Sequence, residues 1–158
     1  MRQSAINVHE SSTIRKSKIF RSKMLYFAAS VVGWLTLAAA QTRTVWDGVY
    51  TDEQAERGRA SYQQSCVGCH RDDLRGDSTA PSLVGESFTF LWGDMEVGEL
   101  VARVQKVMPP ERPGGLPAQT YTDIIAFVLK KNEFPAGHTE LGADPDSLHA
   151  LITAKASK

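Results

Sequence analysis

The pentapeptide Cys66-Val67-Gly68-Cys69-His70 constrains this chain more than any other feature of its sequence. Its two cysteines are the only cysteines among 158 residues. Two thiols three positions apart lie on one turn of a helix, and an imidazole follows them directly. In this Cys-x-x-Cys-His pattern both thiols bond to one side of a porphyrin and the histidine binds its iron. The motif predicts one covalent c-type haem, held by Cys66 and Cys69, with His70 as an iron ligand.

Three other uses of a Cys-x-x-Cys pair remain as alternatives. A structural zinc site needs four ligands, but His9 lies near the start of the chain, and His138 and His149 are eleven positions apart rather than three to five. A thioredoxin-like redox pair follows a strand, whereas the residues before Cys66 have a helical pattern. A plain disulfide is the third alternative. The sequence favours haem attachment over all three.

Residues 1–40 have the pattern of an export signal. A basic cluster at residues 15–23 precedes an apolar run from Met24 to Leu37, which ends in Ala38-Ala39-Ala40. This order predicts a secretory signal peptide that is cleaved after Ala40. The alternative is an uncleaved membrane anchor, because no charged residue occurs from Met24 to Thr42. Export to the periplasm agrees with covalent haem attachment, which takes place on the outer face of the membrane.

The charge of the exported part differs from that of the whole chain. The chain contains 18 basic and 18 acidic residues, of which six basic and one acidic lie in residues 1–40. The remainder therefore holds 12 basic and 17 acidic residues, a net charge of −5. Such a mildly acidic domain does not favour nucleic-acid binding. Its length of about 118 residues suits one small domain.

A first helix is expected to lead into the haem motif. Thr51 is a candidate N-cap, and Gln54 stands at the position of its reciprocal capping partner. Gly58 and Tyr62 share one helical face with Cys66. Because glycine disfavours a helix interior, Gly58 suggests the close approach of another helix.

Further helices are expected after the motif. Residues 71–90 show little periodicity, whereas Glu96–Val107 has a helical apolar pattern. A third main helix is predicted to start at Thr120, with Asp123 in the capping-box position. A short tail helix capped by Asp144 follows in the C-terminal extension.

The candidates for a second iron ligand are Met95, Met108, His138 and His149. Met108 is preferred, because the following nine residues include four prolines and two glycines, which stiffen the backbone around it. Both histidines lie beyond the last main helix, in the part of the chain expected to be least anchored. A Met108 ligand would favour electron transfer. An open iron would instead suit a gas sensor or a peroxidase-like enzyme.

These residues together resemble the class I (monohaem) cytochromes c. The resemblance covers nearly all of residues 50–135 and includes Gly58, Tyr62, Cys66 to His70, Ala80 to Leu83, Met108-Pro109 and the helix around Phe127. It implies an all-α, cytochrome c-like fold of three to five helices around one covalently bound haem, in which the first and last main helices cross.

The resemblance also implies roles for single residues. Cys66 and Cys69 would carry the thioether bonds, while His70 and Met108 would be the proximal and distal iron ligands. The main-chain carbonyl of Pro81 would accept a hydrogen bond from the ring nitrogen of His70 that does not bind iron. The expected organisation is a signal peptide over residues 1–40, a cytochrome c domain over 41–137, and an extension with a short helix over 138–158.

A narrower similarity concerns small periplasmic cytochromes associated with quinoprotein dehydrogenases. It is carried by Phe90-Leu91-Trp92, Leu100, Met108-Pro109-Pro110 and the segment from Pro135 to Leu141. This similarity implies that Trp92 lies beside a haem propionate, with ordinary core packing as the alternative. It implies an electron-transfer protein rather than an enzyme, with a quinoprotein dehydrogenase and a terminal oxidase or another cytochrome as redox partners.

Overall fold

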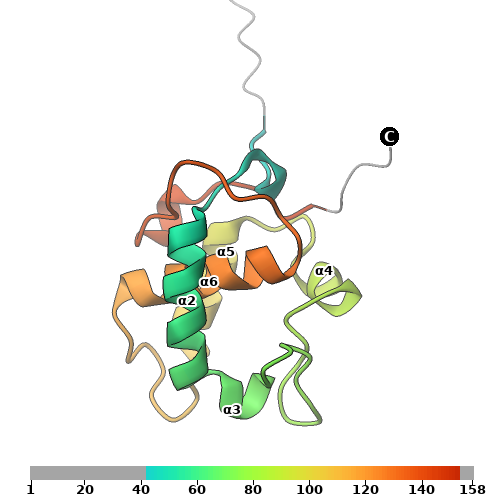
Figure 1. The fold of residues 1–158 in the computed structure, drawn as a ribbon, viewed down its shortest axis with the longest axis vertical. Coiled ribbons are helices and arrows are strands. Elements are labelled where there is room, and N and C mark those ends of the chain that lie inside the picture. The colour runs from blue at the N-terminus through green and yellow to red at the C-terminus, as the bar shows by residue number, and fades with distance from the viewer. Residues whose placement is uncertain (1–41, 154–158) are drawn as a thin grey trace, which may run out of the picture. The chain divides into compact units, whose positions relative to one another are not determined.

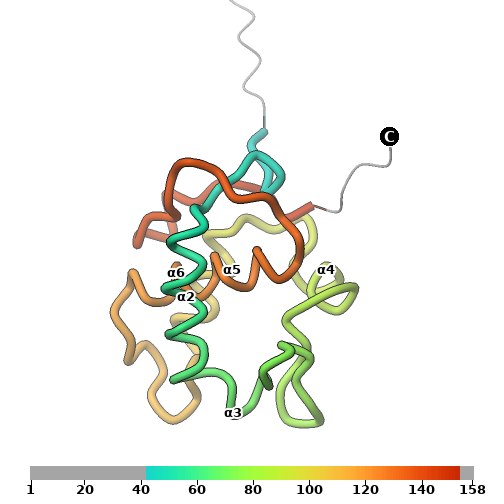
Figure 2. The backbone as a smooth tube through the Cα atoms, viewed as in Figure 1, coloured from blue at the N-terminus to red at the C-terminus, as the bar shows by residue number. Residues whose placement is uncertain are grey.

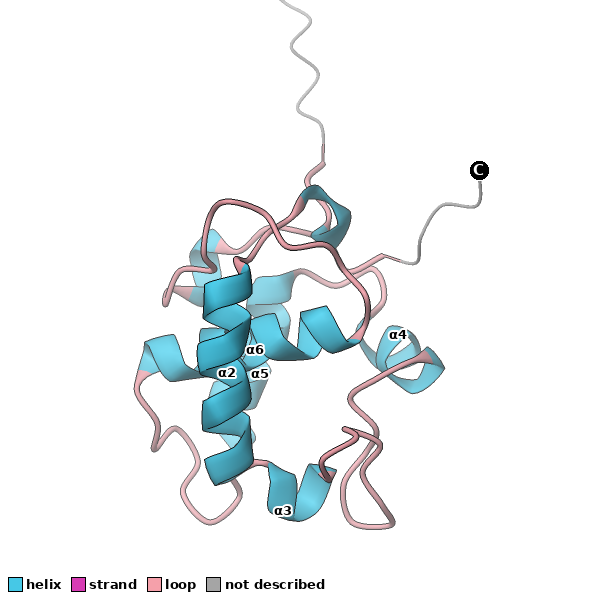
Figure 3. Ribbon diagram, in the orientation of Figure 1, coloured by secondary structure: helices cyan, strands magenta, loops and turns pink. Residues whose placement is uncertain are grey.

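A computed structural model describes residues 42–153, and the predicted signal peptide lies outside the described residues. Its elements are the 3-10 turn η1 (Val45–Asp47), the helices α2 (Asp52–Ser65), α3 (Val67–His70), α4 (Glu86–Trp92), α5 (Val97–Val107) and α6 (Ala118–Lys131), and the 3-10 turn η2 (Pro145–Ser147). Figures 1 and 3 show these helices joined by long loops, and no β-strand occurs among residues 42–153. The all-α, cytochrome c-like fold class is therefore confirmed.

The helices α2 and α6 cross in direct contact and form the centre of the domain (Figures 1 and 2). Gly58 lies at the crossing, where a Cβ atom would stand only 1.8 Å from the main-chain oxygen of Asp123. Next to this point the rings of Tyr62 and Phe127 pack with their centroids 5.3 Å apart. Gly58 is thus required because only a residue without a side chain permits this approach.

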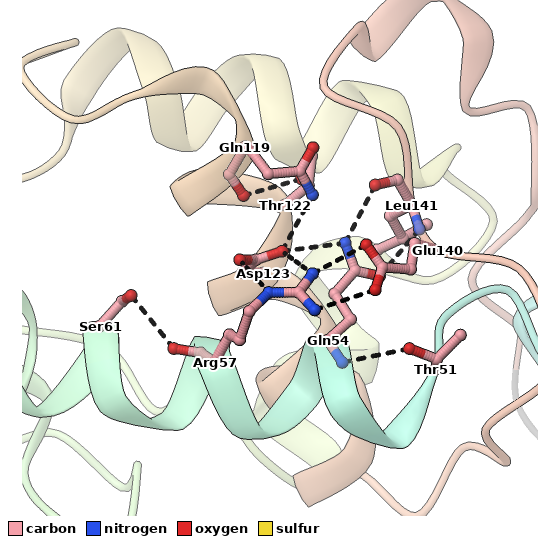
Figure 4. Close-up of polar contacts among 9 residues, drawn as sticks. All are labelled: Thr51, Gln54, Arg57, Ser61, Gln119, Thr122, Asp123, Glu140 and Leu141. Carbon is pink, nitrogen blue, oxygen red and sulfur yellow. Dashed lines mark hydrogen bonds and ion pairs between the residues drawn. The ribbon is translucent and has the colours of Figure 1, made fainter.

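A polar network reinforces the same crossing (Figure 4). The carboxylate of Asp123, which is buried, accepts hydrogen bonds from Gln54 and Gln119 and pairs with Arg57. Arg57 also pairs with Glu140 through a second nitrogen, at 2.8 Å. The network therefore joins α2, α6 and the C-terminal extension.

Two details of the predicted caps are wrong. Thr51 does cap α2, since its side chain accepts from the Gln54 amide, but the Gln54 side chain turns to Asp123 and to Leu141 instead of closing a capping box. The last main helix begins at Ala118 rather than at Thr120, so Asp123 lies in its interior. In both cases a side chain that could cap its own helix instead binds a residue of another element, since Gln54 and Asp123 bind each other.

The loop after the haem motif contains an element that periodicity did not reveal. The helix α4 occupies residues 86–92, two turns in which only Phe88 is buried. A helix with a single buried residue leaves no apolar repeat in the sequence. The helix predicted over residues 96–107 is present as α5, which begins one residue later than predicted.

The described part of the C-terminal extension, residues 138–153, is packed rather than loosely held, contrary to expectation. Its predicted helix is reduced to the single 3-10 turn η2, with Asp144 as N-cap as predicted. Beyond it Leu151 forms isolated bridges with Thr44 and Glu96, and Ile152 is completely buried. The extension thus ties the residues before α2 to the start of α5. No described helix combines the length and apolar character needed to cross a bilayer.

Candidate haem-binding site

Cys66 joins α2 to α3, and Cys69 and His70 lie in the single turn of α3. Cys66 ends α2, and its main-chain oxygen accepts hydrogen bonds from the amides of Cys69 at 3.2 Å and His70 at 3.0 Å. Both cysteines are free thiols; Cys66 is half-buried and Cys69 is exposed. The turn therefore presents two separate thiols and one imidazole from the same short segment.

The Cys66 thiol is a weak acid in this environment. Burial, and secondarily the neighbouring Cys69, raises the pKa of Cys66 to about 11. A thiol–disulfide oxidoreductase needs the opposite shift, because its attacking cysteine must ionise near neutral pH. Cys66 is therefore poorly suited to be the attacking thiol of a disulfide exchange.

The His70 ring is held in one orientation by Pro81. Its Nδ1 atom lies 3.0 Å from the main-chain oxygen of Pro81, and the residue is only 8% exposed. A carbonyl oxygen can only accept a hydrogen bond, so Nδ1 carries the proton. In the neutral ring the other nitrogen, Nε2, is then the one available to bind a metal.

The Pro81 loop is fixed from both sides. The Gly76 amide donates to the His70 oxygen at 3.1 Å, and the Asp77 amide donates to the Ala80 oxygen at 3.0 Å. Gly76 has a φ of +63°, and a Cβ atom there would stand 2.1 Å from the Ala80 oxygen. This position therefore demands glycine, and the turn brings Pro81 back over the His70 ring.

Asn132, a residue that the sequence did not single out, holds the continuation of the same loop. Its side-chain oxygen accepts from the Gly85 amide, and its side-chain nitrogen donates to the oxygens of Leu83 and Val128, all at 2.9 Å. Asn132 lies directly after α6. The only sequence signal was an asparagine at a helix C-terminus, which is too common to identify this role.

Met108 ends α5 and begins the proline-rich loop, as predicted. Its amide donates to Val104 at 2.8 Å, while its oxygen accepts from the Tyr121 hydroxyl at 2.8 Å and from the Gly114 amide at 3.4 Å. The residue is half-buried. Met108 is thus held by its main chain, and its role as an iron ligand stays a prediction.

The other residues that the sequence offered as possible haem contacts lie in different environments. Trp92 is the half-buried last residue of α4, and within residues 42–153 no group accepts a hydrogen bond from its indole N–H. Met95 is bonded through its main chain to Trp92 and Ile152. His138 is exposed, and exposed His149 lies 3.0 Å from a carboxylate oxygen of Glu96. The roles of these four residues remain predictions.

Several apolar side chains within residues 67–116 are incompletely covered. Those that pack against the core yet keep part of their surface exposed are Val67, Leu83, Val84, Trp92, Val104 and Leu116. Phe90 is 90% exposed and Leu91 is 47% exposed. Two free thiols and an imidazole whose Nδ1 is held by Pro81 together fit a haem. Cys66 and Cys69 would hold it covalently, and His70 would bind its iron.

The comparison with protein families agrees with this donor set. Neither the curated proteins nor the solved structures contain a match to the chain. Residues 53–128 match the family model described as cytochrome C oxidase, cbb3-type, subunit III. The matched residues run from α2 into α6 and include the Cys66–His70 motif and Met108. This part of the chain is therefore supported as a domain of a c-type cytochrome family, for which haem c is the cofactor.

Proposed function

We propose that this protein is an exported monohaem c-type cytochrome that carries one electron at a time between redox proteins. The observation that carries the proposal is the Cys66–His70 turn, in which Pro81 holds the His70 ring with Nδ1 protonated at 3.0 Å. A haem bound there would supply a reversible one-electron couple between ferrous and ferric iron.

His70 and Pro81 act as a pair in this proposal. The hydrogen bond from Nδ1 to the Pro81 oxygen fixes the ring plane and makes the opposite nitrogen more basic. Because Gly76 and Asn132 fix the loop that carries Pro81, the ring keeps one orientation in both oxidation states. A ligand that does not move lowers the cost of exchanging an electron.

We infer that Met108 is the second axial ligand. It follows a helix end and begins a loop whose backbone is restrained by prolines and by Tyr121. A thioether ligand favours the ferrous state and gives a higher reduction potential than a second histidine. By filling the sixth position it would also keep oxygen and peroxide from the iron, which separates a carrier from a sensor or a peroxidase-like enzyme.

The cellular location and the redox partners of the protein are further parts of the proposal. The pattern of residues 1–40 supports export to the periplasm, with or without retention as a membrane anchor. The similarity around Phe90-Leu91-Trp92 supports a quinoprotein dehydrogenase as electron donor and a terminal oxidase or another cytochrome as acceptor. In this arrangement Trp92 would donate its indole N–H to a haem propionate.

The test is a reduced-minus-oxidised visible spectrum of protein produced in cells with haem-attachment machinery. A sharp reduced α-band together with a weak near-infrared sulfur–iron band in the oxidised form is expected. Colour that survives a denaturing gel in the native protein, and is lost in Cys66→Ser, would establish covalent attachment. A haem spectrum without the sulfur band would contradict Met108 ligation, and absence of haem would contradict the whole proposal.

A further inference from the structure

The phenol of Tyr121 bridges the two ends of the loop that begins at Met108. Its hydroxyl donates to the Met108 oxygen at 2.8 Å and accepts from the Leu116 amide at 3.3 Å. The sequence positions that it joins are eight residues apart. One side-chain oxygen therefore closes the loop by using both its donor and its acceptor capacity.

Tyr121 stands on the most firmly held element of the domain. It is 2% exposed and lies in the first turns of α6, a helix whose residues 121–129 are all buried. The loop itself contains few other restraints. The Gly114 amide reaches the Met108 oxygen at a long 3.4 Å, and the turns at Arg112 and Gly115 are local. Tyr121 thus supplies side-chain hydrogen bonds that tie both ends of the loop to α6.

We propose that Tyr121 is a positioning residue that keeps the Met108 side chain in place as an iron ligand. The inference rests on the proposed function, in which Met108 fills the sixth position. Tyr121 does not itself touch the iron in this scheme. It holds the main chain on either side of the loop, so that withdrawal of Met108 requires both hydrogen bonds to be broken.

The two bonds are expected to act as a unit. Donation to the Met108 carbonyl polarises the hydroxyl oxygen and strengthens its acceptance from Leu116. When an external ligand takes the sixth position, Met108 has to move away and the loop has to open. Tyr121→Phe keeps the aromatic packing but removes both bonds, so opening becomes easier.

The experiment is a titration of the oxidised holoprotein with imidazole, followed by loss of the near-infrared sulfur–iron band. In Tyr121→Phe the apparent dissociation constant for imidazole should fall about fivefold to thirtyfold, the range expected for one or two hydrogen bonds. The matched control is Tyr50→Phe. Tyr50 is equally buried, and its hydroxyl also donates to a main-chain oxygen, that of Phe134, but it does not contact the loop.

The outcomes separate the inference from the proposed function. Unchanged imidazole affinity in Tyr121→Phe, or an equal fall in Tyr50→Phe, would overturn the role of Tyr121 while Met108 ligation stands. A native protein without a sulfur–iron band would overturn Met108 ligation and the role of Tyr121 together.

A second measurement needs no substitution and covers the case in which Tyr121→Phe fails to fold. The Leu116 amide donates to the Tyr121 hydroxyl, so its hydrogen exchange reports directly on this link. Slow exchange in the native protein that becomes at least tenfold faster at saturating imidazole is expected. Fast exchange at Leu116 without imidazole would overturn the inference.

Discussion

One added methyl group at the crossing of α2 and α6 should destabilise the folded protein. In Gly58→Ala the new Cβ would lie 1.8 Å from the Asp123 oxygen and 2.4 Å from the Asp123 carbonyl carbon. An ordinary contact begins at 3.4 Å, so the shortest distance falls 1.6 Å short. Both contacts are main-chain atoms of a buried helix, which cannot rotate away, and the two helices would have to separate.

The size of the effect follows from two opposing contributions. Overpacking of a core costs about 1–3 kcal/mol and sometimes more, and separation of these helices would also stretch the Arg57–Asp123 pair beside the crossing. Alanine in a helix interior recovers about 1 kcal/mol relative to glycine. Because the contact is so short, the upper end of the overpacking range applies, and we expect a net loss of about 2 kcal/mol in the free energy of unfolding, which lowers the melting temperature by roughly 10 °C.

The assay is thermal and denaturant unfolding of the holoprotein followed by far-ultraviolet circular dichroism. Ala60→Gly is the matched control, because Ala60 is exposed on the same helix two positions away. It measures the propensity contribution alone and should cost about 1 kcal/mol. If Gly58→Ala were as stable as the native protein, or more stable, the close crossing would be refuted.

Three further substitutions or treatments test the site. Met108→Ala should fold, lose the sulfur–iron band, lower the reduction potential and bind carbon monoxide when reduced; an unchanged potential would reject Met108 as ligand. Asn132→Ala should destabilise the protein by about 1–2 kcal/mol and speed amide exchange in the loop after Pro81, and unchanged exchange would contradict its anchoring role. In haem-free protein the pKa of Cys66 is raised to about 11 by burial, so its reactive thiolate is scarce at neutral pH and grows as the pH rises toward that value. Iodoacetamide at pH about 8 should therefore modify exposed Cys69 first, and equal rates measured by peptide mass spectrometry would contradict the burial of Cys66.

The helix α6 restrains two loops, one near each of its ends. Tyr121 near its start holds the Met108 loop, and Asn132 directly after its end holds the loop that follows Pro81. The same helix is fixed by its crossing with α2 at Gly58. One buried helix thus serves as the common support for two loops from different parts of the chain.

Much of the helical framework was predictable because it depends on local patterns. The N-cap at Thr51 follows from capping chemistry. The span of α5 follows from apolar periodicity, and its end at Met108 follows from the proline that comes next. The failures have a common cause. Gln54 and Asp123 carry side chains suited to local caps, yet each finds a partner across the helix crossing that only the tertiary structure supplies. The short helix α4 buries one residue and therefore leaves no period to detect.

The sequence by itself determined which groups are available for the proposed haem attachment, because two thiols and an imidazole within five consecutive residues share one turn wherever that turn lies. It also suggested a close helix contact at Gly58, since a glycine inside a helix needs a steric reason. The tertiary structure alone decided how the site is held. Tyr121 and Asn132 act through side-chain hydrogen bonds to main-chain atoms up to 49 positions away. Such contacts follow no periodicity, so they exist only once the packed helices bring the loops to them.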